Sequence, residues 1–379
     1  MKTALFIAMC VYILTRLLRR RHHQPSTARG SIDAVVPAFN EGPCLERSLT
    51  DLLRNPYIAK VICVNDGSTD DTAQVLEHMQ SKWSGRLLAV HQANTGKGGA
   101  LMHGLAHVTC PQVFLTDADT RIDPLTDGLG YMLAEIERGA DAVGGIPSSC
   151  LHGAGFLPHV RASLKLPMIV IKRSFQQWLG GAPFIISGSC GLFRTQVLRD
   201  VGFSDRTKVE DLDMSWSLVA KGYRLRQCNR SFVYPQECNT IAEEWRRWRR
   251  WIVGYAVCMR LHKGLLLSRF GVFSILPMAM LAVVGMLASL ATWVGAIQHH
   301  GPVGILIAVL PWVWLAIVSI LGAFSAAHHR NAWLIPAAVF SILYVLLAYA
   351  IWATHGFKGL LTGREPVRDK PTRYSHVVE

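Results

Sequence analysis

The sequence predicts an α/β domain of the Rossmann-like type, with a mostly parallel sheet and with transmembrane helices at its N- and C-terminal sides. Between residues 32 and 115, strand-like apolar runs alternate with helix-like stretches. This alternation is typical of a parallel sheet with right-handed crossovers. The 379 residues are 50% hydrophobic, which is too apolar for one soluble domain, and the apolar excess lies at the two ends of the chain.

Three runs near the C-terminal end contain no Asp, Glu, Lys or Arg: Val272–Ile297, Pro302–Phe324 and Ala332–Ala353. Each run is about 20 residues or longer, which is enough to cross the hydrocarbon core of a bilayer. Trp and Tyr near the ends of these runs fit the aromatic belts of a membrane interface. The alternative is a set of buried core helices, which we consider less consistent with three such runs in a row.

The N-terminal 21 residues are predicted to be an uncleaved membrane anchor. Residues 3–15 are apolar, and Arg16 and Arg19–Arg21 follow them. A signal peptide has a similar apolar length, but no small-x-small cleavage site precedes these arginines. Basic residues that flank an anchor stay in the cytoplasm, so we expect a multi-pass protein of the plasma (inner) membrane whose α/β domain is cytoplasmic.

The basic tail conflicts with this topology. Three spans after a cytoplasmic domain leave the tail outside, yet its positive residues favour the inside. A re-entrant second or third run would remove the conflict, because Pro311 and Pro336 interrupt these runs, and a weak charge bias is the alternative. The basic residues concerned are Lys358, Arg364, Arg368, Lys370 and Arg373.

The net charge of +13 indicates a membrane surface as the partner and no nucleic acid. The basic residues gather at 16–21, 246–250 and 358–373, always beside apolar segments, where anionic lipid headgroups attract them. The nine cysteines are scattered without a CxxC or a Cys/His ligand spacing. This pattern fits reduced cytosolic thiols and argues against a zinc site or a disulfide framework.

Two aspartates mark the predicted site. The run Val113–Leu115 reads as a buried strand, and Asp117 and Asp119 follow it. Ligands bind beyond the carboxyl ends of strands in an open parallel sheet, and side chains two residues apart on an extended chain point the same way. The pair can therefore hold one Mg²⁺ or Mn²⁺ ion together with a diphosphate. An Asp-rich turn that solvates itself is the alternative.

The first two strands also end in polar residues. Pro37 is expected to end the strand at 32–36, Asn40 to cap the next helix, and Phe39 to stack on a base or to join the core. Asp66 follows the strand at 60–65 and is placed to bind a nucleobase or a ribose. Ser68 and Asp71 have the spacing of a capping box.

A glycine-rich turn around Lys97 follows the third strand, at 87–91. It lacks the Walker pattern, but its backbone N–H groups and the Lys97 charge can meet a phosphate. A plain strand-to-helix turn is the alternative that we favour for this turn taken alone.

Two further stretches point to an acceptor site. Residues 142–146 are expected to form a strand, and so is the run after Pro183, which leads to a Gly188–Ser189 turn where an acceptor can approach the backbone. Glu210 and Asp211 open a helix, and Asp211 is a plausible base for an acceptor hydroxyl. The alternatives are a packed turn and acids favoured by the helix dipole.

From Trp245 to Trp251, a tryptophan stands at every third position and a pair of arginines lies between successive tryptophans. Their spacing predicts a helix that lies in the membrane interface. Arg250 can meet a leaving diphosphate and Trp251 can stack on a sugar ring, or the helix is only a surface anchor.

Taken in order, these motifs resemble the processive family-2 glycosyltransferases of membranes, which make poly-N-acetylglucosamine, chitin, hyaluronan and cellulose. The resemblance covers roughly residues 32 to 260. It is carried by residues 37–41, 65–68, 94–100, 117 with 119, 188–194, 210–211 and 247–251.

The resemblance implies a GT-A fold, a nucleotide-sugar donor, usually a UDP-sugar such as UDP-GlcNAc, and inversion by direct displacement. It implies Asp211 as the general base and Asp117 with Asp119 as catalytic residues that hold Mg²⁺ or Mn²⁺. The expected donor-binding residues are Pro37, Phe39, Glu41, Asp66, Lys97, Asp117 and Arg250. The expected acceptor-binding residues are Gly188, Ser189, Glu210 and Trp251.

One departure leaves the acceptor open. The family writes Gln-x-x-Arg-Trp, whereas this chain has Arg247 at the first position, as do glycosyltransferases similar to ceramide glucosyltransferase. The retained Asp213 and Trp216 nevertheless favour a growing polysaccharide as the acceptor, with a lipid as the alternative. A non-catalytic, nucleotide-sugar-binding scaffold of an export complex, and an accessory export subunit, are further hypotheses.

We divide the chain into an anchor (1–21), a glycosyltransferase domain (22–244), an interfacial helix (245–268), three apolar membrane segments (269–355) and a basic tail (356–379).

Overall fold

The computed structural model describes residues 24–123, 126–277, 279–280 and 302–365. The expected N-terminal anchor, most of the first apolar run and the tail beyond residue 365 lie outside these residues.

One eight-stranded sheet forms the centre of the domain, in the order β3-β2-β1-β4-β7-β6-β8-β5. The first four strands, β1 to β4, run parallel to one another, which confirms the Rossmann-like alternation. Beyond them β7 is antiparallel to both β4 and β6, and β5 is antiparallel to β8, so the whole sheet is mixed. The strands are β1 (Ile32–Ala38), β2 (Ile58–Asp66), β3 (Leu87–Gln92), β4 (Gln112–Leu115), β5 (Thr120–Ile122), β6 (Ala142–Pro147), β7 (Gly191–Arg194) and β8 (Leu225–Pro235).

Two strand predictions were wrong in detail. β1 continues through Pro37, which still pairs with Val64 of β2, and because the pairing of β1 with β4 already ends at Val35, no bond to β4 is lost with the missing N–H of proline. The run after Pro183 is irregular. Its backbone bonds to α8 through Ser215 Oγ and Trp216 Nε1, and the strand begins only at Gly191.

Helices pack on both faces of the sheet. Their bounds are α2 (Gly42–Arg54), α3 (Thr72–Lys82), α4 (Gly96–Ala106), α5 (Gly128–Glu137), α6 (Phe156–Gly180), α7 (Thr195–Val201), α8 (Glu210–Ala220), α9 (Ile241–Leu261), α11 (Pro302–His329), α12 (Leu334–Val339), α13 (Ile342–Ile351) and α14 (Phe357–Thr362), with short turns of helix η1 (Lys263–Leu265), η2 (Gly271–Ile275) and η3 (Trp352–Gly356).

Alternating residues of β1 belong to two separate cores. Ala34 and Val36 pack in the core that contains Leu45 of α2, whereas Val35 packs in the core that contains Leu105 of α4. This is the period-two pattern of a strand buried on both faces. The second core also contains Trp216 and residues of α9, so the sheet is joined directly to the helices below it.

Two helix N-caps in the first half of the domain differ from the prediction. Asn40 has a positive φ of 53°, and its side chain accepts a hydrogen bond from Thr69 N, so it does not cap α2. Ser68 Oγ accepts from Asn40 N, and α3 begins only at Thr72. The two loops therefore bond to each other across the carboxyl ends of β1 and β2.

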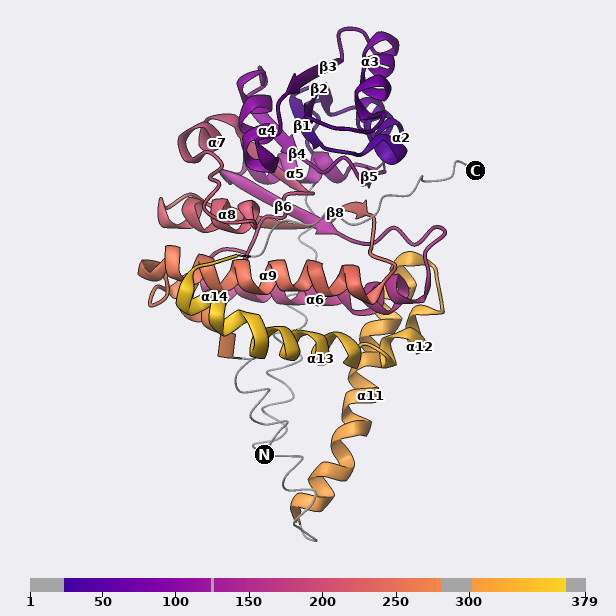
Figure 1. Cartoon of the computed structure of the whole chain (residues 1–379), viewed down its shortest axis with the longest axis vertical. Coiled ribbons are helices and arrows are strands. Elements are labelled where there is room, and N and C mark those ends of the chain that lie inside the picture. The colour runs from indigo at the N-terminus through magenta and orange to yellow at the C-terminus, as the bar shows by residue number, and fades with distance from the viewer. Residues whose placement is uncertain (1–23, 124–125, 278, 281–301, 366–379) are drawn as a thin grey trace.

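The helical layers are visible in Figure 1. α6 and α9 lie below the sheet, α13 and α14 lie below α9, and α11 extends away from the domain. In the described part of the chain, two helical segments are long and apolar enough to cross a membrane, Trp312–His329 and Leu334–Thr362.

Candidate active site

The segment after β4 carries the two aspartates, and it is a turn. Thr120 N donates to Asp117 O at 3.0 Å, so the extended geometry that we assumed for Asp117 and Asp119 was wrong. Asp119 is buried and accepts a hydrogen bond from Thr120 Oγ1, whereas the Asp117 side chain keeps 32% of its surface exposed. Asp117 is therefore the more accessible of the two carboxylates.

Lys97 at the start of α4 joins this turn to α8. Its Nζ lies 2.6 Å from Asp117 Oδ1 and 3.2 Å from Glu210 Oε1. The glycine turn before it is held by Asp66, because Asp66 Oδ1 accepts from Gln92 Nε2 at 2.7 Å and from Thr95 N at 2.8 Å. The buried Asp66 carboxylate thus fixes the loop that aims Lys97 at the acids.

Asp211 lies beside this cluster on the first turn of α8. Asp211 Oδ2 accepts a hydrogen bond from Gly188 N at 3.0 Å. Burial raises the pKa of Asp211, and the neighbouring carboxylates of Glu210 and Asp117 raise it further, while Lys97 and the Gly188 N–H oppose them. A carboxyl group with a raised pKa beside a polar turn fits the role of a general base.

The turn Ser187–Ser189 closes the cluster from another side. Thr116 Oγ1 at the end of β4 donates to Ser189 O at 3.0 Å, so the turn is attached to the strand that precedes the two aspartates. A Cβ at Gly188 would lie 3.0 Å from Lys97 Nζ and 3.4 Å from Asp211 Cβ. A side chain at this position would therefore press on both charged residues, and glycine lets the backbone approach them closely.

The first loop has a more structural character. Pro37 and Phe39 are half-buried. Glu41 is 4% exposed, its N–H donates to Thr72 Oγ1 at 2.8 Å, and Cys44 Sγ donates to Glu41 Oε2 at 3.3 Å. These contacts fasten the start of α2 to α3, next to the carboxyl end of β1.

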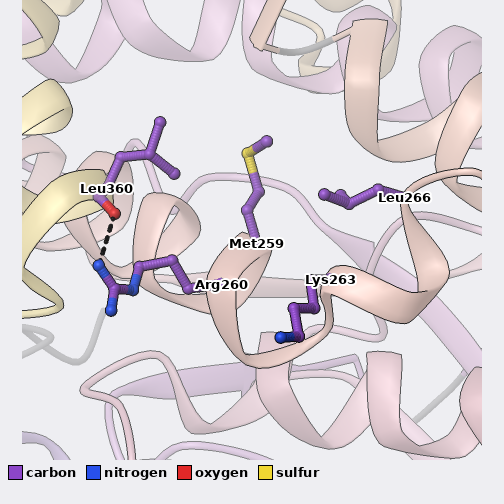
Figure 2. A pocket seen from close by; sticks show the side chains of 5 residues that line it. All are labelled: Met259, Arg260, Lys263, Leu266 and Leu360. Carbon is purple, nitrogen blue, oxygen red and sulfur yellow. Dashed lines mark hydrogen bonds between the residues drawn. The ribbon is translucent and has the colours of Figure 1, made fainter.

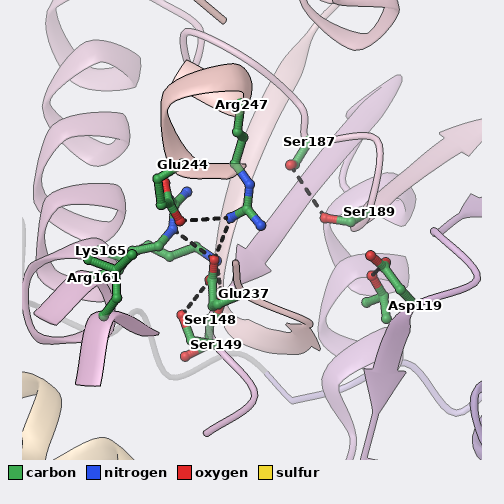
Figure 3. Close-up of polar contacts among 12 residues, drawn as sticks. Asp119, Ser148, Ser149, Arg161, Lys165, Ser187, Ser189, Glu237, Glu244 and Arg247 are labelled. Carbon is green, nitrogen blue, oxygen red and sulfur yellow. Dashed lines mark hydrogen bonds and ion pairs between the residues drawn. The ribbon is translucent and has the colours of Figure 1, made fainter. Parts of the chain in front are cut away.

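A second charged cluster, which the sequence analysis missed, lies where α6, α9 and the segment after β8 meet (Figure 3). Glu237 lies at its centre, 2.8 Å from Arg161, and it is 2.6 Å from both Lys165 and Arg247. Glu244 pairs with Arg161 at 2.9 Å. We refer to these five residues as the Glu237 cluster.

The Glu237 cluster is largely buried, and each of its charged groups lies beside at least one group of opposite charge. Burial alone would raise the pKa of Glu237, but Arg161, Lys165 and Arg247 together lower it far below its usual range. Burial lowers the pKa of Lys165 to about 8 despite the nearby Glu237. The cluster joins α6 to α9, because Arg161 and Lys165 come from one helix and Arg247 and Glu244 from the other.

Arg247, the residue that departs from the family pattern, is thus committed to the Glu237 cluster. Trp251 on the next turn of α9 has the guanidinium groups of Arg161 and Arg247 at 5.1 and 5.8 Å from its ring, and 38% of its surface is exposed. The exposed part of this ring is available to a ligand, and the nearby cations stabilise the ring through cation–π contacts. Arg250 is half-buried beside it.

Asp213 and Trp216 of α8 have structural roles. Asp213 accepts from Ser204 and Arg206 and lies 2.7 Å from His262. Burial would raise the pKa of Asp213, but these partners lower it. Trp216 is fully buried. Both residues attach α8, which carries Asp211, to its surroundings.

No three Asp, Glu, His or Cys side chains of the described residues come together as a metal site. The donor atoms near the β4 turn are nevertheless carboxylate oxygens, which Mg²⁺ and Mn²⁺ prefer, and Asp117 is accessible. The accessible Asp117 carboxylate therefore fits a hard divalent ion that takes further ligands from a diphosphate, whereas Asp119 is buried and accepts a hydrogen bond from Thr120.

Comparison with known proteins decides the family. The family model "Glycosyl transferase family 2" matches residues 33–202. The chain is 62% identical over all of its 379 residues to the uncharacterized glycosyltransferase YaiP of Escherichia coli K12, and the match covers 95% of that protein. The chain belongs to glycosyltransferase family 2.

More distant relatives of this glycosyltransferase include the poly-β-1,6-N-acetyl-D-glucosamine synthase of Staphylococcus epidermidis. It is 29% identical over 244 residues, which are 63% of this chain and 57% of the synthase. A synthase of the same name from Staphylococcus aureus COL is 30% identical over 228 residues, 59% of this chain and 54% of that one. The matched region thus spans little more than half of these synthases.

A mannosyltransferase of Pyrobaculum calidifontis, solved with GDP-mannose and Mn²⁺, has the same fold. Its TM-score is 0.62 at 22% identity, and the match covers 90% of this chain and 96% of that one. The likeness shows a GT-A-like fold. Within this fold, Lys97, Asp117, Glu210 and Asp211 form the cluster that we take as the candidate active site.

Proposed function

We propose that this glycosyltransferase transfers a sugar from a nucleotide-sugar, a UDP-sugar such as UDP-GlcNAc, to a growing polysaccharide at the cytoplasmic face of the inner membrane. The observation that carries the proposal is the meeting of Lys97, Asp117, Glu210 and Asp211 at one edge of the sheet. The names of the staphylococcal relatives support N-acetylglucosamine as the sugar.

In this proposal the donor lies over the carboxyl ends of β1, β2 and β4, as ligands do in open sheets of this kind. Pro37, Phe39 and Glu41 border the nucleotide from one side. Asp66 meets the nucleotide with Oδ2, because Oδ1 already holds the Lys97 loop. Lys97 and Arg250 are the positive charges assigned to the diphosphate.

Displacement at the anomeric carbon needs a base on the acceptor side. The oxygen of the acceptor hydroxyl bonds to the anomeric carbon while the bond to the diphosphate oxygen breaks, and the hydroxyl proton passes to the Asp211 carboxylate. Mg²⁺ or Mn²⁺ on Asp117 and Asp119 would neutralise charge on the departing diphosphate. Attack from the side opposite the leaving group gives inversion.

The acceptor is placed between the Ser187–Ser189 turn and α9. Gly188 and Ser189 offer backbone and a small side chain, Glu210 offers a buried carboxylate, and Trp251 offers an aromatic face. Aromatic faces favour the C–H surface of a sugar ring. In Figure 3, Ser187, Ser189 and Asp119 lie on the opposite side of the view from the Glu237 cluster.

A lipid acceptor is the second candidate. Trp251 is 6.1 Å from Trp248, which in turn contacts Tyr344 of the apolar segment α13 at 5.9 Å. The proposed acceptor residue is therefore two ring contacts away from an apolar helix, which suits a lipid-linked hydroxyl as well as a polymer end.

Labelled UDP-GlcNAc and GDP-mannose, each incubated with membranes that contain the full chain, test the proposal. Retained label of high mass from UDP-GlcNAc is the expected result. Label that organic solvent extracts would instead identify a glycolipid product, and label from GDP-mannose alone would contradict the UDP-sugar assignment. Membranes with Asp211→Asn serve as the matched control.

A further inference from the structure

The two apolar segments of the described chain have similar lengths and different directions. The α11 helix has 28 residues, and the candidate span Leu334–Thr362 has 29, so each measures about 42 Å as a helix and exceeds a hydrocarbon core of about 30 Å. Figure 1 shows α11 running away from the domain, whereas α13 and α14 run alongside α9. Length alone does not distinguish them, but position does.

The second segment begins at the catalytic domain. Just before it, His329 Nε2 lies 3.1 Å from Ser148 Oγ, which follows β6. One turn earlier, Ser325 Oγ donates to Ser163 O of α6 at 2.8 Å. The C-terminal end of α11 is therefore fastened to the underside of the sugar-transfer domain.

The same segment also ends at the catalytic domain. Arg260 Nη1 of α9 donates to Leu360 O at 3.1 Å. Three residues after α14, the Glu365 carboxylate accepts from Thr207 Oγ1 and from Lys208 N, both at 2.5 Å. Thr207 and Lys208 immediately precede the Glu210–Asp211 turn. A straight helix that crossed the bilayer would place its two ends on opposite sides, and here both ends bond to one domain.

The first part of the segment, α12, packs on α6 and α11, and from α13 onward one face packs on α9. Tyr344 contacts Trp248, Trp352 contacts Tyr255 at 6.0 Å, and a Cβ at Gly359 would lie 2.7 Å from Val253 Cγ1. The other face is apolar and exposed. Its most exposed side chains are Ile342, Leu343, Leu346, Phe340 and Leu361, with exposed fractions of 41%, 48%, 56%, 49% and 76%.

Positive charges flank this apolar face at both ends. Arg330 precedes it and Lys358 lies near its end, with no Asp, Glu, Lys or Arg from Asn331 to Phe357. Figure 2 shows a cavity of about 400 Å³ beside α14, lined by Met259, Leu266 and Leu360 and by the cations Arg260 and Lys263. Apolar side chains next to two cations suit the headgroup region of anionic lipids.

We propose that residues 334–362 do not cross the bilayer and lie in its interface on the catalytic side, with their exposed face in the lipid and Glu365 back at the active-site domain. α11 is then the crossing segment of the pair. This assignment removes the conflict posed by the basic tail, because the third apolar run is the one that stays on the inside. It rests on the membrane location in the proposed function and not on sugar transfer.

Single cysteines test the sidedness in the full chain. Leu361→Cys probes the end of the segment, Ser81→Cys on exposed α3 marks the catalytic side, and Val303→Cys marks the far end of α11. A membrane-impermeant maleimide is applied to spheroplasts and to inverted inner-membrane vesicles, and labelling of the parent chain is subtracted for the native cysteines. We expect Leu361→Cys and Ser81→Cys to react only in inverted vesicles, and Val303→Cys only in spheroplasts.

Depth in the bilayer separates an interfacial helix from a deep re-entrant one. Nitroxides at Leu346→Cys and Ile320→Cys, both at exposed apolar positions, are compared by collision with oxygen and with a polar relaxer. The proposal predicts a shallow Leu346 position and a deep Ile320 position. Labelling of Leu361→Cys from the side opposite Ser81→Cys, or equal depth of the two nitroxides, would overturn it. Neither readout needs an active enzyme, so a failed transfer assay leaves this test intact.

Discussion

Two charged clusters flank the space assigned to the acceptor, and they are built differently. At the sheet edge, Lys97 pairs with both Asp117 and Glu210, and the pKa of Asp211 is raised by burial and by these neighbouring acids. In the Glu237 cluster, three cations meet two carboxylates, and the pKa of Glu237 is lowered in spite of its burial.

This difference distinguishes a cluster suited to binding and catalysis from a cluster that stabilises the packing of two helices. Crowded acids with raised pKa values are typical of positions that await a positive ligand or accept a proton. In a buried cluster whose carboxylates are already paired with several cations, these carboxylates are not available to a substrate. Such a cluster instead holds its helices in register. The account therefore predicts opposite consequences when one charge is removed from each cluster.

The largest expected effect is on turnover, at Asp211. Asp211→Asn keeps an oxygen for the Gly188 N–H but cannot accept the acceptor proton, so kcat should fall about 10²–10⁴-fold. Stability at neutral pH should not fall, because the substitution removes a buried charge among other acids. Nucleotide release and thermal melting measure the two quantities, and nucleotide binding should persist. Wild-type turnover in this variant would remove Asp211 as the base.

The next effect is on stability, at Glu237. Glu237→Gln leaves Arg161, Lys165 and Arg247 with Glu244 as their remaining acid in the cluster, and should cost about 3–5 kcal/mol. The loss should be present at neutral pH and shrink as pH falls toward the lowered pKa of the wild-type carboxyl, because protonated Glu237 gives the wild type the same defect. Denaturant melts across pH check this, with Glu243→Gln on the half-buried side of α9 as the control. A melting curve like that of the wild type would contradict the structural assignment.

A smaller effect is expected at Lys97. Its charge lowers the pKa of Asp211, so Lys97→Met should move the acid limb of the rate profile to higher pH and reduce kcat/KM by about tenfold, of the order lost with one charge-assisted contact. In the wild type the sign is the same: activity disappears as pH falls through the raised pKa of Asp211, because the base becomes protonated. Lys97→Arg should retain the position of the acid limb. An acid limb unmoved by Lys97→Met would separate Lys97 from the base.

The smallest effect is expected at Glu365. Its carboxylate fixes Thr207 and Lys208 just before the base-bearing helix, so Glu365→Gln, which can still accept one of these bonds, should lower kcat about two- to threefold with little change in donor KM. Glu365→Ala should lower kcat further. Equal activity of both variants and the wild type would show that this contact does not position the site.

The local strand pattern predicted the first four strands well, because each is a short apolar run that ends at polar residues. The convergence of Lys97 and Asp117 was expected from the rule that the carboxyl ends of parallel strands meet, whereas Asp211, which opens a helix, was assigned to the site by the family resemblance. The extended DxD was wrong because a strand pattern contains no information on the hydrogen bond from Thr120 N that makes the turn.

The Glu237 cluster could not be predicted in this way. Arg161 and Lys165 are far from Glu237 and Arg247 in the sequence, and their pairing depends on how α6 packs on α9. A signal existed for α9 itself: Thr240 and Glu243 form a capping box, and this spacing can be read directly from the sequence. For residues 334–362, Pro336 and the basic tail had indicated a re-entrant run as one alternative, but apolar length alone could not decide between the second and the third run.

Nucleotide release by the detergent-purified full chain tests the central claim most directly. The account predicts release from at least one nucleotide-sugar in the presence of Mg²⁺ or Mn²⁺, loss of release with a chelator, and loss of release in Asp117→Asn and Asp119→Asn variants that melt like the wild type. A folded wild-type protein that releases nucleotide from no donor with either metal, or releases it equally with the chelator, would contradict the account.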